Sequence, residues 1–385
     1  MSDENSGVWW DSTWNPVVGC SPVSPGCLNC YAARMARRLG SNPATPQFAG
    51  LTVDGKWTGE TRHVWKVLCV PFARRKPQRI FVCSMGDLFH ESVSFEYLDQ
   101  VFAVMAQASQ HTFMLLTKRP ERMEAFCSPD RYGILRQILH ESGASNINSG
   151  WPLPNVILMA TAEDQTRADE RMPHIAELTG RGWRTGVSVE PMLGPVDLSP
   201  WLEGWMCRRC GVARLPMGEH GYCDCPIPDD PEEAQGDHRQ GMVDWVIAGG
   251  ETGPDARPAH PDWFRSLRDQ CADAGTPFFF KQWGEHLPAV RMRDWDWRGH
   301  KGLKHYLPPD LASLPCRRLK WDAVEQDGSV LQSFKIDDHP DAYNMFRVGK
   351  ARAGRILDGV EHNAFPEVRR WGAVLQTIEN AGGQA

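Results

Sequence analysis

The stretch RIFVCSMGD at residues 79–87 decides the fold class, because it joins an apolar strand directly to a polar loop. Its apolar beginning has the length of a buried β-strand, and its end carries a glycine and a carboxylate. Runs of the same kind occur at 111–117, 155–161, 183–189, 243–250 and 277–282, with amphipathic stretches such as 94–109, 166–178 and 260–275 between them. Short apolar strands that alternate with amphipathic helices predict a parallel sheet in an α/β fold.

Polar or charged residues follow each of these strands. They are Met85-Gly86-Asp87, Thr117-Lys118-Arg119, Thr161-Ala162-Glu163, Glu190-Pro191, Gly249-Gly250-Glu251 and Lys281-Gln282. In a (β/α) barrel such residues converge on one face, whereas a doubly wound sheet gathers its function at one switch point. No G-x-G-x-x-G follows the first strand. We therefore predict an incomplete (β/α) barrel of about six or seven parallel strands, with a doubly wound sheet as the alternative.

Composition is typical of a globular cytoplasmic protein. The chain has 385 residues, of which 41% are hydrophobic and 23% charged, so it is long enough for a large core. The polar, acidic N-terminus and the lack of any apolar run near the roughly 20 residues of a membrane span predict neither a signal peptide nor a membrane partner. A net charge of -6 argues against indiscriminate binding to nucleic acids but allows a local basic groove.

Three cysteines lie in the loop after the first short strand, which we place at 13–18. Cys20, Cys27 and Cys30 have the spacing C-x6-C-x2-C, and no fourth cysteine follows for almost forty residues. Soft thiolates select iron–sulfur clusters, zinc or copper(I). A [4Fe-4S] cluster held by three cysteines leaves one iron without a protein ligand, and a zinc site is the alternative.

Several motifs resemble those of a known family. They are TWNPVVGCSPVSPGCLNCYA (13–32), SMGDLFHE (84–91), LLTKRPERM (115–123), VSVEPMLGPVDL (187–198), GGETGPDARPAHPDWFRSLRDQC (249–271), PFFFKQWG (277–284) and RVGKARAGRILDG (347–359). Together they resemble a phage-associated family of uncharacterised radical-SAM-like proteins within the radical S-adenosylmethionine (SAM) superfamily. The commonest spacing there is C-x3-C-x2-C, so this loop is longer, and Asn29 stands where an aromatic residue often precedes the third cysteine.

The resemblance implies a chemistry and a set of residues. A cluster on Cys20, Cys27 and Cys30 would cleave SAM to a 5′-deoxyadenosyl radical that abstracts a substrate hydrogen, with Lys118 and Lys281 as further catalytic residues. Lys118 or Arg119 would pair with the SAM carboxylate or a substrate anion. The implied cofactor-binding residues are Tyr31, Ser84, Met85, Gly86, Asp87, Thr117, Thr161, Glu163, Ser188, Glu190, Gly249, Gly250 and Glu251.

A second cysteine group predicts a separate metal site. Cys207, Cys210, Cys223 and Cys225 have the spacing C-x2-C-x12-C-x-C, in a stretch that is rich in Gly, Pro and Asp and would need a metal to fold. Zn²⁺ is the first choice and a second iron–sulfur cluster the alternative. We therefore divide the chain into a radical-SAM-like barrel at 8–285, a metal-binding insertion within it at 205–240, and a C-terminal extension at 286–385 that packs on the barrel.

The expected function is that of a radical SAM enzyme, an isomerase, mutase or lyase. Its substrate, by the resemblance, is an amino-acid-modified thymidine in phage DNA, which it would rearrange in the host cytoplasm. A reductant such as flavodoxin or ferredoxin would supply the electron. Two alternatives stay open: a radical SAM enzyme that acts on tRNA or a small metabolite, and a non-enzymatic zinc-bearing protein that binds nucleic acid.

Overall fold

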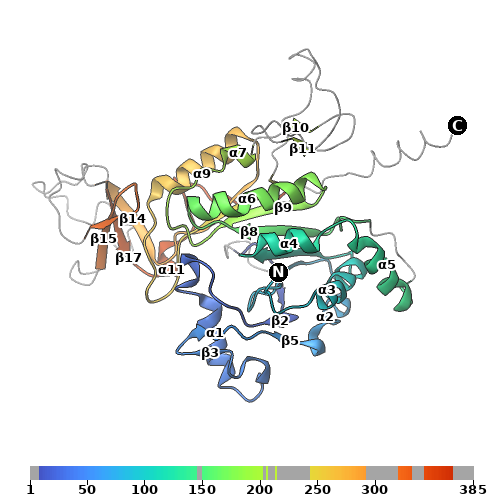
Figure 1. Ribbon diagram of the computed structural model, residues 1–385. Helices are drawn as coiled ribbons and strands as arrows, with labels where there is room; N and C mark the ends of the chain where they lie inside the picture. Colours follow the sequence, from blue (N-terminus) through green and yellow to red (C-terminus); the bar gives the residue numbers. More distant parts are fainter. Residues whose placement is uncertain are drawn as a thin grey trace, which may run out of the picture.

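A seven-stranded parallel sheet forms the centre of the protein. The computed structural model (Figure 1) describes residues 8–144, 150–202, 205–206, 213–214, 243–291, 320–331 and 342–366. The sheet contains β1 (Ser12–Trp14), β6 (Arg79–Val82), β7 (Thr112–Thr117), β8 (Val156–Thr161), β9 (Arg184–Val189), β12 (Val246–Gly249) and β13 (Phe278–Gln282) in this spatial order. All neighbouring strands pair in parallel.

The strand order follows the chain order from one edge to the other, without a reversal. A doubly wound sheet would reverse its order at a switch point, so that alternative is wrong. The sheet is instead a curled half-barrel, as expected for an incomplete (β/α) barrel. Because every strand points the same way, the residues that follow the strands come together at one rim.

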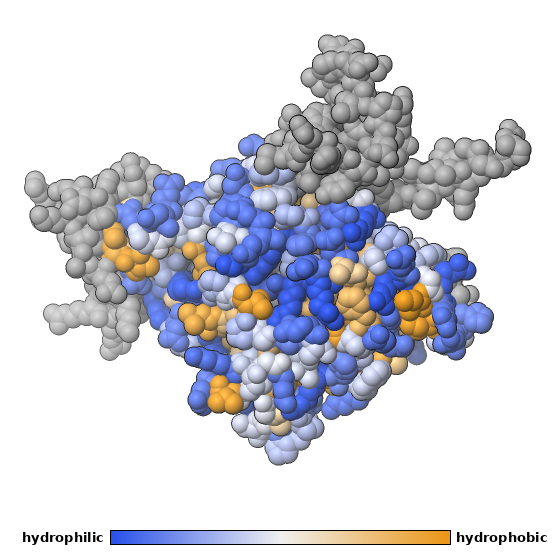
Figure 2. Space-filling model, in the orientation of Figure 1, coloured by the Kyte–Doolittle hydropathy of each residue, from blue (hydrophilic) through white to orange (hydrophobic). Residues whose placement is uncertain are grey.

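Helices cover the outer face of the half-barrel. They are α3 (Phe95–Gln107), α4 (Pro120–Phe126), α5 (Arg131–Glu141), α6 (Gln165–Gly180) and α9 (Pro261–Asp273), with short α2 (Val70–Ala73), α7 (Ser199–Leu202) and α11 (Lys350–Ala353). α1 (Tyr31–Gly40) packs instead in a separate cluster with Phe48, Leu51 and Trp57. Their starts follow local rules: Ser94 and Asp164 cap α3 and α6 by accepting backbone N–H groups, and α4 and α9 begin with proline. In Figure 1, α4 and α6 lie side by side, and in Figure 2 hydrophilic residues dominate this face.

Both faces of the sheet are buried, which explains why its strands read as continuous apolar runs. Along β8, Leu158 and Ala160 pack under the helices, while Ile157 and Met159 alternate with them and point into the half-barrel. The inner cluster gathers one or two residues from each of several strands. Its buried members are Trp9, Phe81, Met114, Ile157, Met159, Trp245, Ile247 and Phe279.

A distant segment of the chain covers the open edge of β13. The Phe280 amide donates to the His362 carbonyl at 3.0 Å, and the Ala364 amide donates to the Phe278 carbonyl at 3.3 Å. The Trp245 indole also donates to the Ala364 carbonyl at 2.8 Å, and its ring lies 4.5 Å from that of Phe365. Residues near 364 therefore complete the inner core at the side where the barrel lacks a strand.

The first predicted strand, 13–18, is wrong in its extent. β1 ends at Trp14, and Val17–Val18 forms β2, which pairs antiparallel with β5 (Arg62–His63) outside the main sheet. Pro16 lies between them and has no N–H to donate to a ladder. Two short strands, β3 (Thr52–Val53) and β4 (Lys56–Trp57), form a hairpin nearby.

The remaining described strands lie outside the half-barrel. β14 (His286–Arg291), β17 (Tyr343–Arg347), β15 (Lys320–Val324) and β16 (Val330–Leu331) form an antiparallel sheet, and β10 (Trp205–Met206) pairs with β11 (Ala213–Arg214). Cys207, Cys210, Cys223 and Cys225 lie outside the described residues, so their metal site and the boundaries at 205–240 and 286–385 stay predictions. No helix among the described residues has the length and apolar character needed to cross a bilayer.

Candidate functional site

One cavity lies at the carboxyl ends of the parallel strands, and most of the predicted site residues line it. The three cysteines of the loop that follows β2 share it with residues from the ends of β6, β7, β8, β9, β12 and β13. The predicted residues that line it are Cys20, Cys27, Cys30, Tyr31, Ser84, Gly86, Asp87, Thr117, Lys118, Thr161, Ser188, Glu190, Gly250, Glu251 and Lys281. The fold thus brings together residues more than 250 positions apart in the chain.

Three predicted residues lie just behind the cavity wall. Met85 is buried in a small cluster under α1, and its carbonyl accepts the Gly19 amide at 3.1 Å. Gly249 lies beside Glu190, because an added Cβ there would be 3.2 Å from the Glu190 carboxyl carbon. Glu163 is fully buried, and its carboxylate contacts Lys118 and Arg171 instead of the cavity.

Sequence reasoning missed two aromatic residues of the cavity. Trp9 and Trp10 line it from just before β1, and the Lys281 ammonium lies 5.4 Å from the centre of the Trp10 ring. Trp283, which follows β13, does not line the cavity. Trp283 is only 5% exposed, and its indole donates to the Ile356 carbonyl at 2.9 Å inside the core.

Side chains from several strand ends hold the cysteine loop. The Asn29 amide donates to the Glu251 carboxylate at 3.0 Å and to the Asp255 carbonyl at 2.7 Å. The Arg257 guanidinium pairs with the same Glu251 and donates to the Pro25 carbonyl at 3.1 Å. Asn29 therefore ties the loop to the glycine-rich segment after β12, a role that its position before the third cysteine did not indicate.

Glu163 holds the middle of the cysteine loop from below. Its Oε2 lies 2.9 Å from the Arg171 guanidinium and 3.2 Å from the Lys118 ammonium, and its Oε1 accepts the Gly26 amide at 3.2 Å. Burial acts to raise the pKa of Glu163, but the charges of Lys118 and Arg171 outweigh it and lower the pKa to about 2. The carboxylate is therefore ionised, and it balances the positive charge of Lys118 within the protein.

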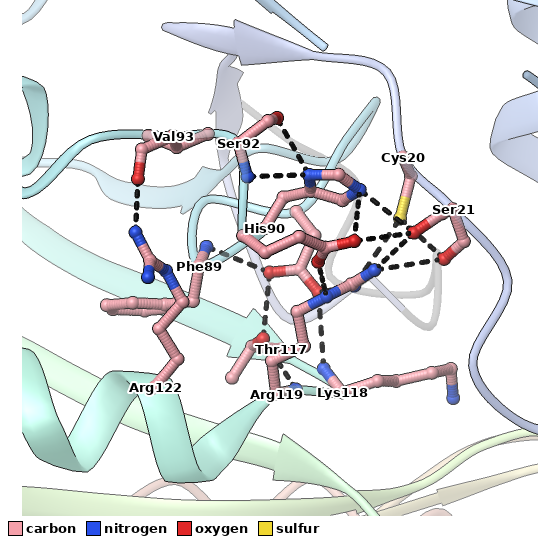
Figure 3. A network of polar contacts seen from close by, with 12 residues as sticks. Cys20, Ser21, Phe89, His90, Ser92, Val93, Thr117, Lys118, Arg119 and Arg122 are labelled. Carbon is pink, nitrogen blue, oxygen red and sulfur yellow. Dashed lines mark hydrogen bonds and ion pairs between the residues drawn. The ribbon is translucent and has the colours of Figure 1, made fainter. Parts of the chain in front are cut away.

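A second network surrounds Cys20 and centres on Arg119 (Figure 3). The Arg119 guanidinium contacts Asp87, Glu91, Ser21 and the Cys20 sulfur. Burial and the Asp87 carboxylate raise the pKa of the Cys20 thiol to about 12, and Arg119 acts against this rise. Since a cysteine must lose its proton to bind iron, metal loading at this thiol would release a proton.

The close approach of two glycines sets the position of Cys20. Gly19 and Gly86 form a parallel bridge, and a Cβ on Gly86 would lie 2.8 Å from the Gly19 carbonyl oxygen. We expect Gly86→Ala to reduce the free energy of unfolding by about 1–3 kcal/mol through overpacking. Gly133→Ala is the matched control, because Gly133 is exposed in the first turn of α5, where a Cβ meets nothing within 4 Å, and the substitution should not destabilise the protein. Urea unfolding of both variants checks this, and equal midpoints would contradict it.

The donor set fits an iron–sulfur cluster. Three partly buried thiols in one loop line the cavity, and the buried Ser188 Oγ on its wall has no hydrogen-bond partner among the described residues, so it can bond a polar cofactor. In the described part of the chain, no three His, Cys, Asp or Glu side chains are grouped to hold a single metal ion. A cubane cluster does not require its cysteines to converge on one ion, because each cysteine binds a different iron atom.

Comparison with family models identifies the family. The model described as "Protein of unknown function (DUF5131)" matches residues 5–366. The chain belongs to the DUF5131 family. The expected assignment to a radical SAM family is therefore wrong, since no radical SAM family model matches this DUF5131 chain. Comparisons with curated proteins and with solved structures found no match.

Proposed function

We propose that this cavity is the active site of an enzyme that binds a [4Fe-4S] cluster on Cys20, Cys27 and Cys30 and SAM beside it. The observation that carries the proposal is that three soft thiols, with no fourth cysteine in their loop, share one cavity with polar residues from six strand ends. Bound there and reduced by an external one-electron donor, such a cluster would supply the electron for reductive cleavage of SAM into methionine and a radical able to take a hydrogen atom from substrate.

The residues of the cavity have two roles: some bind SAM, and others hold the cysteine loop in place. The backbone around Gly86 offers carbonyl groups to the SAM amino group, and Thr161 and Ser188 offer hydroxyls to its ribose. Glu251, with Asn29 and Arg257, keeps the cysteine loop against the strand ends. Tyr31 is 47% exposed at the rim, and its hydroxyl donates to the Ser84 carbonyl at 2.9 Å, so its ring can border the adenine.

For the substrate, we propose an amino-acid-modified thymidine in DNA. Lys281 and Glu190 form an ion pair at 2.9 Å on the cavity wall. This pair presents one cation and one anion, which match the carboxylate and ammonium groups of an amino-acid substituent. The Trp10 ring beside Lys281 offers a flat surface on which a base can stack. Rearrangement at a saturated carbon that no neighbouring carbonyl group activates needs hydrogen abstraction, because acid–base chemistry cannot remove a proton from such a carbon.

Anaerobic reconstitution tests the proposal directly. The protein with cluster should absorb broadly near 400 nm, bleach on reduction with dithionite, and release 5′-deoxyadenosine from SAM. Omission of dithionite is the control and should abolish the product. An intact, reducible cluster that yields no 5′-deoxyadenosine would contradict the radical mechanism. Zinc without iron would instead favour a non-enzymatic binding protein.

The substrate class needs its own measurement. DNA that carries amino-acid-modified thymidine is incubated with reduced protein and SAM, digested, and its nucleosides are separated by chromatography with mass detection. A nucleoside of unchanged mass but new retention indicates an isomerase. We expect Lys281→Met to reduce this product at least tenfold through loss of the cation, while SAM cleavage without substrate persists. Equal turnover of unmodified DNA would refute the role of the amino-acid group.

A further inference from the structure

We propose that Arg119 is a positioning residue that fixes the Cys20–Ser21 segment and promotes reduction of the cluster bound at Cys20. The second half of this inference rests on the proposed function, and the first half does not. Arg119 follows β7, and its side chain is only 10% exposed. It lies among groups from the cysteine loop and from the loop after β6 (Figure 3).

Every nitrogen of the guanidinium has a partner within the protein. Nε donates to Glu91 at 2.9 Å, Nη1 donates to Asp87 at 2.9 Å, and Nη2 donates to the Ser21 hydroxyl at 2.7 Å and the Ser21 carbonyl at 3.2 Å. Nη1 also lies 3.8 Å from the Cys20 sulfur. The planar fork is thus fully used, and Arg119 has no nitrogen to spare for a SAM carboxylate or a substrate anion.

Arg119 is itself held in place. Asp87 is only 5% exposed and also accepts the Thr117 hydroxyl at 2.8 Å and the Phe89 amide at 3.0 Å, so its carboxylate is a fixed anchor. On the other side, His90 is buried and lies 2.9 Å from the Ser21 hydroxyl. The Ser92 amide donates to His90 Nδ1, which assigns the proton to Nε2 and makes His90 a donor to Ser21.

The neighbouring Lys118 has a different task. Figure 3 shows its side chain extending away from the Arg119 network. Lys118 pairs with the buried Glu163 at 3.2 Å under the middle of the cysteine loop. The two consecutive cations after β7 therefore support two different parts of one loop, and only Arg119 reaches a sulfur.

Contact with a sulfur ligand has a consequence for reduction. One-electron reduction adds negative charge to a cluster and its thiolates. A nearby cation that donates an N–H to a ligating sulfur stabilises the reduced form more than the oxidised form. Loss of Arg119 removes this effect and also leaves the carboxylates of Asp87 and Glu91 without their cation. Both changes make the cluster harder to reduce.

The test compares Arg119→Gln and Arg119→Lys with Arg122→Gln. Arg122 is the matched control because it lies on α4, which begins directly after Arg119, donates to the Val93 carbonyl and packs over Phe95 at 4.6 Å without reaching the cysteine loop. In a spectroscopic redox titration, the ratio of reduced to oxidised cluster at a fixed potential should fall roughly tenfold in Arg119→Gln. It should fall less in Arg119→Lys, which keeps the charge, and stay unchanged in Arg122→Gln.

A second measurement does not need the cluster. In cluster-free protein, hydrogen–deuterium exchange of a peptide covering residues 19–30 should be several-fold faster in Arg119→Gln than in wild type or Arg122→Gln. Unchanged exchange overturns the positioning role. A reduction potential of the cluster in Arg119→Gln equal to that in wild type overturns the role in reduction. If Arg119→Gln binds no iron, the potential of Arg119→Lys decides this point. A wild-type protein that takes up no cluster refutes the proposed function and the role in reduction, and the exchange result still decides the positioning role.

Discussion

Replacement of Cys20, Cys27 and Cys30 together by alanine is expected to abolish cluster iron and SAM cleavage. The three thiols are the cysteines of one loop. Cys83, which is buried just after β6, also lines the cavity, but its single sulfur cannot replace three. All three are partly exposed, and their loss should leave the fold intact. Iron and sulfide analysis after anaerobic reconstitution gives the readout, with circular dichroism as the check on folding.

A matched control strengthens this experiment. Cys69 is exposed at the start of α2 and does not line the cavity, so Cys69→Ala should keep wild-type iron content. Zinc on the second cysteine group, where it is present, should persist in the triple variant. Wild-type iron in the triple variant would show that the cluster lies elsewhere and would remove the basis of the proposed function.

Glu163→Gln is expected to reduce the free energy of unfolding by about 3–5 kcal/mol. The substitution keeps the side-chain shape but removes the charge that neutralises Arg171 and Lys118, whose side chains are 6% and 19% exposed. Loss of one partner of a buried ion pair leaves the other charges buried and unpaired. Glu170→Gln is the control, because Glu170 lies beside Arg171 on α6 and forms a partly exposed pair with Arg167 worth about 1 kcal/mol or less.

The effect of Glu163→Gln should depend on pH. Folding lowers the pKa of Glu163 from 4.5 to about 2, so the folded state favours the ionised form. Its stabilisation is fully present above about pH 4.5 and is lost as the pH falls toward 2. Urea unfolding at several pH values should show the gap between wild type and Glu163→Gln narrowing over this range. A gap that is constant with pH would show that the charge of Glu163 is not the source of the difference in stability.

The sequence by itself determined the local elements and their direction. Apolar runs such as 155–161 predicted strands that the structure contains nearly residue for residue, because a strand buried on both faces needs an uninterrupted apolar run. The residues that follow the strands predicted the functional rim, since parallel strands present all their carboxyl ends at one edge. Most of the residues predicted at this rim do line the cavity.

Only the tertiary structure decided which side chains face the cavity and which support it. Glu163 is next to a strand end like Glu190, but it turns into the protein and pairs with Arg171, which lies eight residues later in the chain, on α6. Trp10 reaches the cavity and Trp283 does not, although both stand beside strands of the half-barrel. Such differences depend on contacts between residues far apart in the chain, and no local pattern of polarity encodes those contacts.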